Sequence, residues 1–150
     1  MVVSWTIRGL ELHQAGLQRS SFYIACQDFE DSSEMIWRTA FLYKDLRMRF
    51  PDWHLQAPAE WKGKKPDRLD SLRLPNGSTF HPLTGRDPNT FRQTGATGVS
   101  LEECAFFPRL AEVVSNAKVM CQGRPGEKDG FMCLVSTVNG ANRAWMKMSH

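Results

Sequence analysis

The most informative stretch of this sequence is GVSLEECAFFP, which runs from Gly98 to Pro108. Its first residues lean apolar, two adjacent carboxylates follow at Glu102 and Glu103, and an apolar run then ends at the proline. The pattern is typical of a short buried strand that delivers acids at its C-terminal end, where ligands bind in open α/β sheets. The two acids also suit the first turn of a helix, because the helix dipole favours negative charge there.

Two acids at the end of a strand are the arrangement that nucleotide hydrolysis requires. One carboxylate holds Mg²⁺, usually through water, and the next orients the water that attacks the terminal phosphate. The spacing of the acids alone leaves the helical and the hydrolytic interpretations open, so the rest of the chain has to decide between them.

Length and composition describe a single globular domain. The chain has 150 residues, which is enough to bury a substantial core, and 41% of them are hydrophobic. It contains no apolar run of about 18 residues, and its first residues lack the pattern of a signal peptide, so we expect no membrane contact. The net charge of +3 permits contact with nucleic acid without requiring it.

The four cysteines are irregularly spaced and form no C-x-x-C pair, which argues against a zinc site or a redox motif. Three of them lie among apolar or small residues and are expected to be reduced thiols of the core, which favours a cytoplasmic location. Zinc chemistry that combines the cysteines with histidines is disfavoured, because ligand spacing is lacking among His13, His54 and His81.

Alternating helix and strand patterns predict an α/β fold with a mostly parallel sheet. Helices are expected over residues 4–17, 28–49, 108–118 and 141–148, and strands over residues 20–26, 98–103 and 131–135. Residues 71–82 predict a hairpin, because Asn76-Gly77 between alternating runs is the strongest short-range signal for one. The first helix carries an imperfect apolar stripe that is expected to face the core, made of Trp5, Ile7, Leu10 and Leu12.

Residues 58–68 form a polar, basic connection without periodicity. Two interpretations remain open for it. The stretch suits a solvated surface loop, which is the commoner outcome for a run of charges. It also suits a loop that contacts the phosphates of DNA through Lys62, Lys64, Lys65 and Arg68.

Three separated segments, residues 85–92, 98–107 and 134–140, resemble the ATPase domain of phage terminase large subunits, the DNA-packaging motors. In that family an asparagine-glycine hairpin precedes a loop with glycine and arginine. A Walker B strand with two acids follows, and a later strand ends in a Ser-Thr-x-Asn-Gly coupling motif. The resemblance extends over residues 20–148. It implies an incomplete P-loop NTPase fold of the ASCE type, with residues 1–150 as a partial ATPase domain lacking its N-terminal part.

The resemblance implies roles for individual side chains. Glu102 stands where the Walker B acid associated with Mg²⁺ stands, and Glu103 falls at the catalytic carboxylate that polarises water. Ser136, Thr137 and Asn139 fall in the coupling motif, which senses the γ-phosphate of ATP. The family usually has aspartate at the first acid, so Glu102 is one methylene longer than its counterpart.

The resemblance is weaker at the positions that would bind the nucleotide than at the two acids and the coupling motif. Arg92 corresponds to the basic residue of the preceding loop, although it equally suits an ion pair with Glu102 or Asp87. Ser4 falls at the Ser/Thr that binds Mg²⁺ at the end of the phosphate loop, and Val3 stands where a lysine is expected. No G-x-x-x-x-G-K-[ST] motif occurs in the sequence. Since that loop supplies most of the affinity for phosphate, we expect weak binding of ATP.

The resemblance therefore implies an ATPase that uses Mg²⁺ and ATP to package double-stranded DNA, with the portal, the small terminase subunit and further copies of the chain as partners in the host cytoplasm. The alternative is a non-catalytic remnant that docks on motor subunits or on DNA. The Walker B assignment also predicts an arrangement. The two acids should end a central strand, beside the end of the strand that leads to Ser136.

Overall fold

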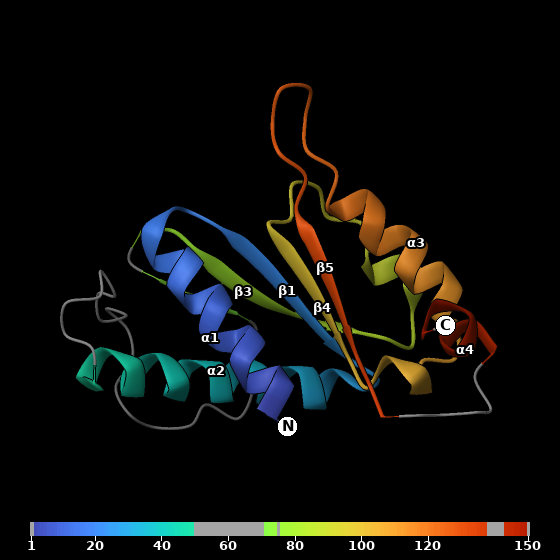
Figure 1. The fold of residues 1–150 in the computed structure, drawn as a ribbon, viewed down its shortest axis with the longest axis horizontal. Helices are drawn as coiled ribbons and strands as arrows, with labels where there is room; N and C mark the ends of the chain where they lie inside the picture. The colour runs from blue at the N-terminus through green and yellow to red at the C-terminus, as the bar shows by residue number, and fades with distance from the viewer. Residues whose placement is uncertain (1, 50–70, 75, 138–142, 150) are drawn as a thin grey trace.

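The computed structural model of the protein describes residues 2–49, 71–74, 76–137 and 143–149 (Figure 1). The helices of these residues are α1 (Val2–Leu17), α2 (Phe29–Arg49), α3 (Leu110–Met120) and α4 (Arg143–Ser149), with short 3₁₀ helices η1 (Pro88–Thr90) and η2 (Cys104–Phe106). The strands are β1 (Ser21–Cys26), β2 (Leu72–Arg73), β3 (Thr79–Thr84), β4 (Gly98–Glu102) and β5 (Phe131–Val135).

The five strands of the described residues form one sheet in the order β2-β3-β1-β4-β5. Strands β3, β1, β4 and β5 run parallel, whereas β2 pairs antiparallel with β3 at the edge of the sheet. The mostly parallel α/β fold and the hairpin at residues 71–82 are thus confirmed. In the hairpin turn, Gly77 has a φ of 87°, a conformation that glycine adopts without steric cost.

Two boundaries near the site and the apolar stripe of one helix differ from the sequence prediction. Strand β4 ends at Glu102, because Glu103 turns into the left-handed region with a φ of 52°. The helix expected at residue 108 begins at Leu110, and Pro108 lies before it. The expected apolar stripe of α1 is also partly wrong, because Leu10 is 66% exposed.

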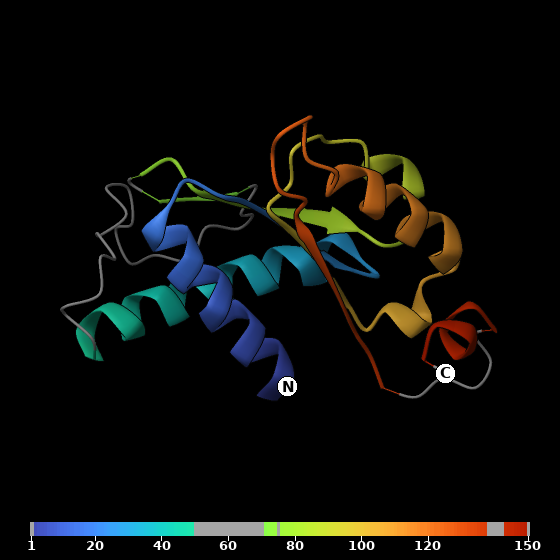
Figure 2. The same ribbon diagram turned by 45° about the horizontal axis from the view of Figure 1, so that its top comes forward.

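Helices cover both faces of the sheet (Figure 2). Side chains of β1 alternate between two cores, as a strand with a period of two requires. Phe22 and Ile24 pack with α1 and α2 on one face, and Tyr23 and Ala25 pack with α3 on the other. The sheet is therefore the middle layer of a three-layer fold.

The side chains of β4 also alternate between the two faces of the sheet, and this alternation positions the site. Val99 and Leu101 belong to the apolar core beneath α3. Ser100 and Glu102 consequently lie on the opposite face of β4, which α1 covers, and both are buried. The buried polar side chains of β4 thus face α1, and α1 has to supply hydrogen-bond partners for them.

The C-terminal ends of β4 and β5 lie side by side. The register pairs Leu101 with Leu134 and Glu102 with Val135, so both strands end at the same edge of the sheet. The N-terminal end of α1 lies at this edge as well (Figure 1). The predicted arrangement is thus confirmed for Glu102, which ends β4 beside the strand that leads to Ser136, whereas Glu103 follows the strand directly.

Cys26, Cys104 and Cys121 are buried free thiols, and Cys133 is a half-buried one. The expectation that three cysteines lie in the core is thus confirmed. Among the described residues, no helix is long and apolar enough to cross a bilayer. The same part of the chain contains no group of three or more His, Cys, Asp or Glu side chains that could hold a metal ion by themselves.

The close approach of two loops at the start of β5 gives a first prediction. A Cβ at Gly130 would overlap the backbone carbonyl oxygen of Ala96 and lie 2.8 Å from that of Thr97. Gly130→Ala should therefore lower the free energy of unfolding by about 2 kcal/mol or more, since backbone atoms cannot move aside cheaply. The measurement is urea unfolding followed by circular dichroism.

Gly9→Ala is the matched control, because a Cβ at this helical position meets nothing within 4 Å. Alanine there should raise the free energy of unfolding by about 0.5–1 kcal/mol. Equal effects of the two substitutions would contradict the close approach at Gly130.

Candidate functional site

Glu102 is the last residue of β4, and its carboxylate is held by two side chains of α1. Ser4 Oγ donates a hydrogen bond of 2.7 Å to Glu102 Oε2. Arg8 Nη2 lies 3.4 Å from Glu102 Oε1, within ion-pair distance. Glu102 is only 5% exposed, so these contacts form in surroundings of low polarity. The structure thus brings together Ser4 and Glu102, two of the residues that the sequence resemblance selected.

Arg8 is itself fully buried and is surrounded by polar groups from α1 and β4. Its Nη2 donates a hydrogen bond of 2.6 Å to Ser100 Oγ, and its Nε lies 3.3 Å from Glu11 Oε2. Ser100 Oγ in turn donates to Glu11 Oε1 at 2.9 Å. We refer to Arg8, Glu11, Ser100 and Glu102 as the buried polar cluster.

The buried polar cluster has an excess of negative charge when both of its acids are ionised, because one guanidinium faces two carboxylates. Burial raises the pKa of Glu11 to about 7, against the opposing effects of Arg8 and the Ser100 hydrogen bond, and the charge of Glu102 raises it further. Several polar atoms of the cluster have no hydrogen-bond partner in the described residues: Arg8 Nε and Nη1, Glu11 Oε2 and Glu102 Oε1.

These features fit a hydrated magnesium ion. Mg²⁺ prefers hard oxygen ligands and usually binds through one or two carboxylates while keeping several waters. The Glu102 carboxylate and the Ser4 hydroxyl supply such oxygens at the edge of the sheet, and Ser4 remains partly exposed there. A cation beside Glu102 would also offset the excess negative charge of the buried polar cluster.

Glu103 follows β4 directly and turns away from the buried polar cluster. Its left-handed backbone directs the exposed side chain toward the end of β5. Glu103 Oε2 accepts hydrogen bonds from Thr137 Oγ1 at 3.2 Å and from Ser136 Oγ at 3.4 Å. The Thr137 backbone N–H donates to the same oxygen at 3.4 Å. Glu103 is thus in contact with Ser136 and Thr137, the first two residues that the resemblance assigned to the coupling motif.

The remaining predicted residues are not part of this assembly. Arg92 is exposed and donates a hydrogen bond of 2.6 Å to Asn89 Oδ1. Within the described part of the chain, Arg92 has no ion pair with Glu102 or Asp87, so the alternative that it pairs with one of them is not realised. Asn139, His54 and the basic residues of 58–68 lie outside the described residues.

Sequence reasoning missed Arg8, Glu11 and Ser100. Their signal was present in the spacing. Ser4, Arg8 and Glu11 recur at steps of four and three, which places them on one face of a helix. Ser100 and Glu102 are two residues apart, which places them on one face of a strand. The predicted apolar stripe of α1 considered only its apolar residues and so left out this polar face.

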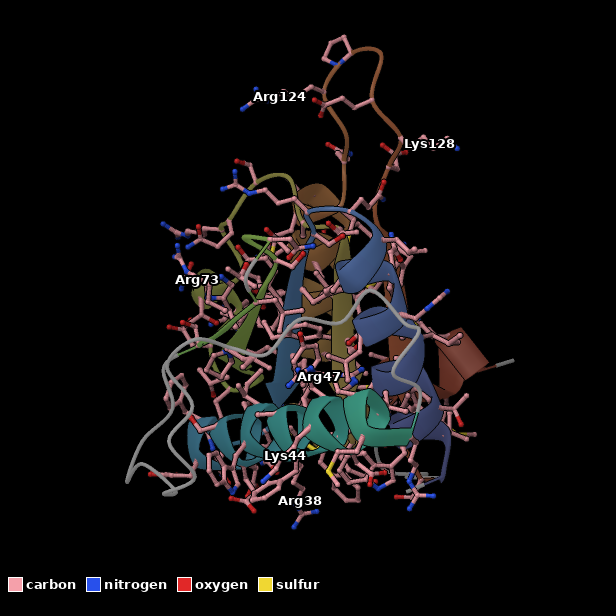
Figure 3. All side chains as sticks on the ribbon, turned by 90° about the vertical axis from the view of Figure 1, so that its left-hand side faces the viewer. Arg38, Lys44, Arg47, Arg73, Arg124 and Lys128 are labelled. Carbon is pink, nitrogen blue, oxygen red and sulfur yellow. The ribbon has the colours of Figure 1, made fainter. Side chains whose placement is uncertain are left out.

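Basic side chains lie among acidic ones on the side of the molecule where α2 ends (Figure 3). The labelled ones come from α2, from β2 and from the loop between α3 and β5: Arg38, Lys44, Arg47, Arg73, Arg124 and Lys128. Arg38 Nε lies 3.4 Å from Glu34 Oε1, so the charge of Arg38 is partly neutralised. The surface is therefore mixed in charge, with several cations that point to solvent.

No protein-family model and no curated protein sequence matches this chain. Two solved structures of the large terminase ATPase domain from Thermus phage P74-26 are similar to it in fold. A point mutant of that domain matches with a TM-score of 0.59 and 17% identity, over 95% of this chain and 58% of its own. A second structure of the domain matches with a TM-score of 0.57 and 17% identity, over 91% and 55% respectively.

The fold thus has the layered α/β architecture of an ATPase domain with a mostly parallel sheet. More particularly, its structural neighbours are the ATPase domain of a phage large terminase, as the sequence resemblance predicted. At 17% identity this likeness establishes the fold alone. The chain spans a little more than half the length of the two structures that it matches.

The raised pKa of Glu11 gives a prediction for the dependence of stability on pH. A carboxyl group whose pKa is raised on folding stabilises the fold below its unfolded pKa, and this contribution is lost as the pH rises through the folded pKa. The shift from 4.5 to about 7 corresponds to a loss on the order of 3 kcal/mol between about pH 4.5 and pH 8. Glu11→Gln should abolish this loss, as urea unfolding at several pH values would measure.

Glu112→Gln is the control for the Glu11 variant. Glu112 is an exposed acid whose pKa is lowered by its hydrogen bond with Arg109, so its contribution has the opposite sign. An unfolding free energy that falls with pH in the same way in the Glu11→Gln chain as in the unchanged chain would refute the assignment.

Proposed function

We propose that this chain is part of a terminase-type ATPase, in whose complete form ATP hydrolysis drives double-stranded DNA into a viral procapsid. The observation that carries the proposal is the meeting of five predicted residues at one edge of the sheet. Ser4 donates to Glu102 on one side of the strand end, and Thr137 and Ser136 donate to Glu103 on the other. The fold of the neighbouring terminase structures supports the proposal.

In this proposal Glu102 and Glu103 have different roles. Glu102 and Ser4 would hold a hydrated Mg²⁺, which when bound would neutralise the charge on the phosphates of ATP. Glu103 is exposed to solvent, where its carboxylate would orient and polarise the attacking water. The hydroxyl groups of Ser136 and Thr137 orient that carboxylate through the hydrogen bonds described above. Arg92 and Asn139 are proposed to act near the phosphates, on the resemblance alone.

The proposed partners follow from the same resemblance. They are double-stranded DNA, the portal, the small terminase subunit and further copies of the chain, in the cytoplasm of the host cell. The basic side chains of α2 and β2 support a partner with a phosphate backbone, since lysine and arginine neutralise phosphates without regard to sequence. The second candidate is a non-catalytic module that docks on motor subunits or on DNA. It is favoured by the lack of a G-x-x-x-x-G-K-[ST] motif in the sequence.

Binding of Mn²⁺ and ATP tests the proposed site. Since the sequence contains no phosphate-binding loop, we expect an affinity weaker than micromolar and negligible hydrolysis, so a method that detects weak binding is needed. In ¹⁵N-correlated NMR spectra, paramagnetic Mn²⁺ with ATP should broaden the amide signals nearest to it. The broadened signals should be those of Ser4, Glu102, Glu103 and Thr137.

Glu102→Gln should abolish the broadening, because the amide removes the charge that attracts the metal. Glu112→Gln, which removes an exposed acid of α3, should leave it unchanged. Broadening centred elsewhere on the molecule would contradict the site. A calorimetric affinity for Mg·ATP near micromolar, about −8 kcal/mol, would contradict the expectation of weak binding.

A further inference from the structure

We propose that Arg8 is a positioning residue for Glu102. Held by Glu11 and Ser100, its guanidinium attracts one oxygen of the Glu102 carboxylate by charge and thereby leaves the other oxygen facing Ser4 and a divalent cation. The inference rests on the proposed metal-binding role of Glu102. It adds to that role three residues to which neither the sequence resemblance nor the comparisons assign a function.

The burial of Arg8 is the first step of the argument. A guanidinium cannot lose its charge in a protein, and a buried charge without partners is very costly. Arg8 is 0% exposed, so the acceptors around it have to compensate its charge, although its Nε and Nη1 make no hydrogen bond among the described residues. Those acceptors are Glu11, Ser100 and Glu102, and each of them is at most 5% exposed. The guanidinium therefore has few alternative orientations.

The second step is the division of the Glu102 carboxylate between two partners. Oε1 faces Arg8 Nη2 at 3.4 Å, and Oε2 accepts from Ser4 Oγ at 2.7 Å. Ser4 and Arg8 are one helical turn apart on α1, so both reach the same carboxylate from the same helix. Oε2 is thus fixed by a hydrogen bond, and Oε1 is drawn to the guanidinium by its charge without a hydrogen bond among the described residues. The oxygen beside Ser4 then points to the edge of the sheet.

The third step concerns the shape of the arginine side chain. Arginine has a rigid planar fork of donors, whereas lysine carries a compact point charge. The Arg8 fork reaches Glu11 through Nε and both Ser100 and Glu102 through Nη2. Because Ser100 and Glu102 lie two positions apart on one face of β4, the fork spans neighbouring positions of the strand. A lysine keeps the charge but has one nitrogen in place of the two, Nε and Nη2, through which Arg8 makes these contacts.

The proposal distinguishes positioning from charge alone. If Arg8 acts only as a positive charge, it repels a cation at Glu102, and Arg8→Lys leaves this repulsion in place. If Arg8 positions Glu102, Arg8→Lys weakens cation binding although the charge is kept. Residues that orient a metal ligand from behind typically contribute about 10–100-fold to metal affinity.

The test measures Mn²⁺ affinity by electron paramagnetic resonance of the free ion, in the full chain and its variants. Arg8→Lys should weaken the affinity about tenfold. Ser100→Ala, which removes one acceptor of Arg8 with little change of volume, should weaken it by a smaller factor. The matched controls are Arg38→Lys in an exposed ion pair of α2, and Ser33→Ala, whose hydroxyl has no hydrogen-bond partner among the described residues. Both controls should bind Mn²⁺ as the unchanged chain does.

The outcomes separate the two proposals. An unchanged chain that binds no Mn²⁺ contradicts the proposed function, and the positioning role with it. Mn²⁺ binding that both Arg8→Lys and Ser100→Ala leave unchanged overturns the positioning role alone, even if these variants are less stable. Should Arg8→Lys fail to fold, the result for Ser100→Ala decides. Weaker Mn²⁺ binding in this folded variant, without any change in Ser33→Ala, supports the role.

Discussion

The Arg8 guanidinium lies between α1 and β4 without access to solvent, and the position of α1 depends on the three groups that surround it. Removing one partner of a buried charge typically costs about 3–5 kcal/mol, because the other charge is left uncompensated. Alternative placements of α1 that separate Arg8 from Glu102 or Ser100 are therefore strongly disfavoured. The cluster fixes the register of the helix on the strand, and with it the approach of Ser4 to Glu102.

The parallel sheet supplies the second part of the arrangement. Because β4 and β5 run in the same direction in adjacent positions, Glu102 and Val135 end their strands at the same level. The left-handed turn at Glu103 then separates the two acids. Glu102 faces the buried polar cluster, whereas Glu103 faces solvent and Thr137. Two neighbouring residues of identical chemistry thus acquire environments suited to different roles.

Much of this arrangement could be predicted from local patterns. The Asn76-Gly77 turn, the apolar run of β5 and the acids that follow β4 each carry a short-range signal. The pairing of Arg8 with Glu102 could not be predicted from local patterns, because 94 positions separate the two residues in the sequence. No local rule connects the face of a helix with the face of a distant strand. The predicted apolar stripe of α1 is partly wrong for the same reason, since it placed Leu10 toward the core. Leu10 faces solvent because β4 presents polar side chains, and a polar face of the helix buries them.

The central claim is that Glu102 and Ser4 form one end of a metal and nucleotide site at the edge of the sheet. Crystals soaked with Mn²⁺ and a non-hydrolysable analogue of ATP at millimolar concentrations test it most directly, because manganese is located by its anomalous scattering. The account predicts an anomalous peak at Glu102 Oε2 and Ser4 Oγ, with the phosphates of the analogue between this peak and Glu103. Manganese bound elsewhere, with the hydrogen bond between Ser4 and Glu102 unaltered and no density beside it, would contradict the account.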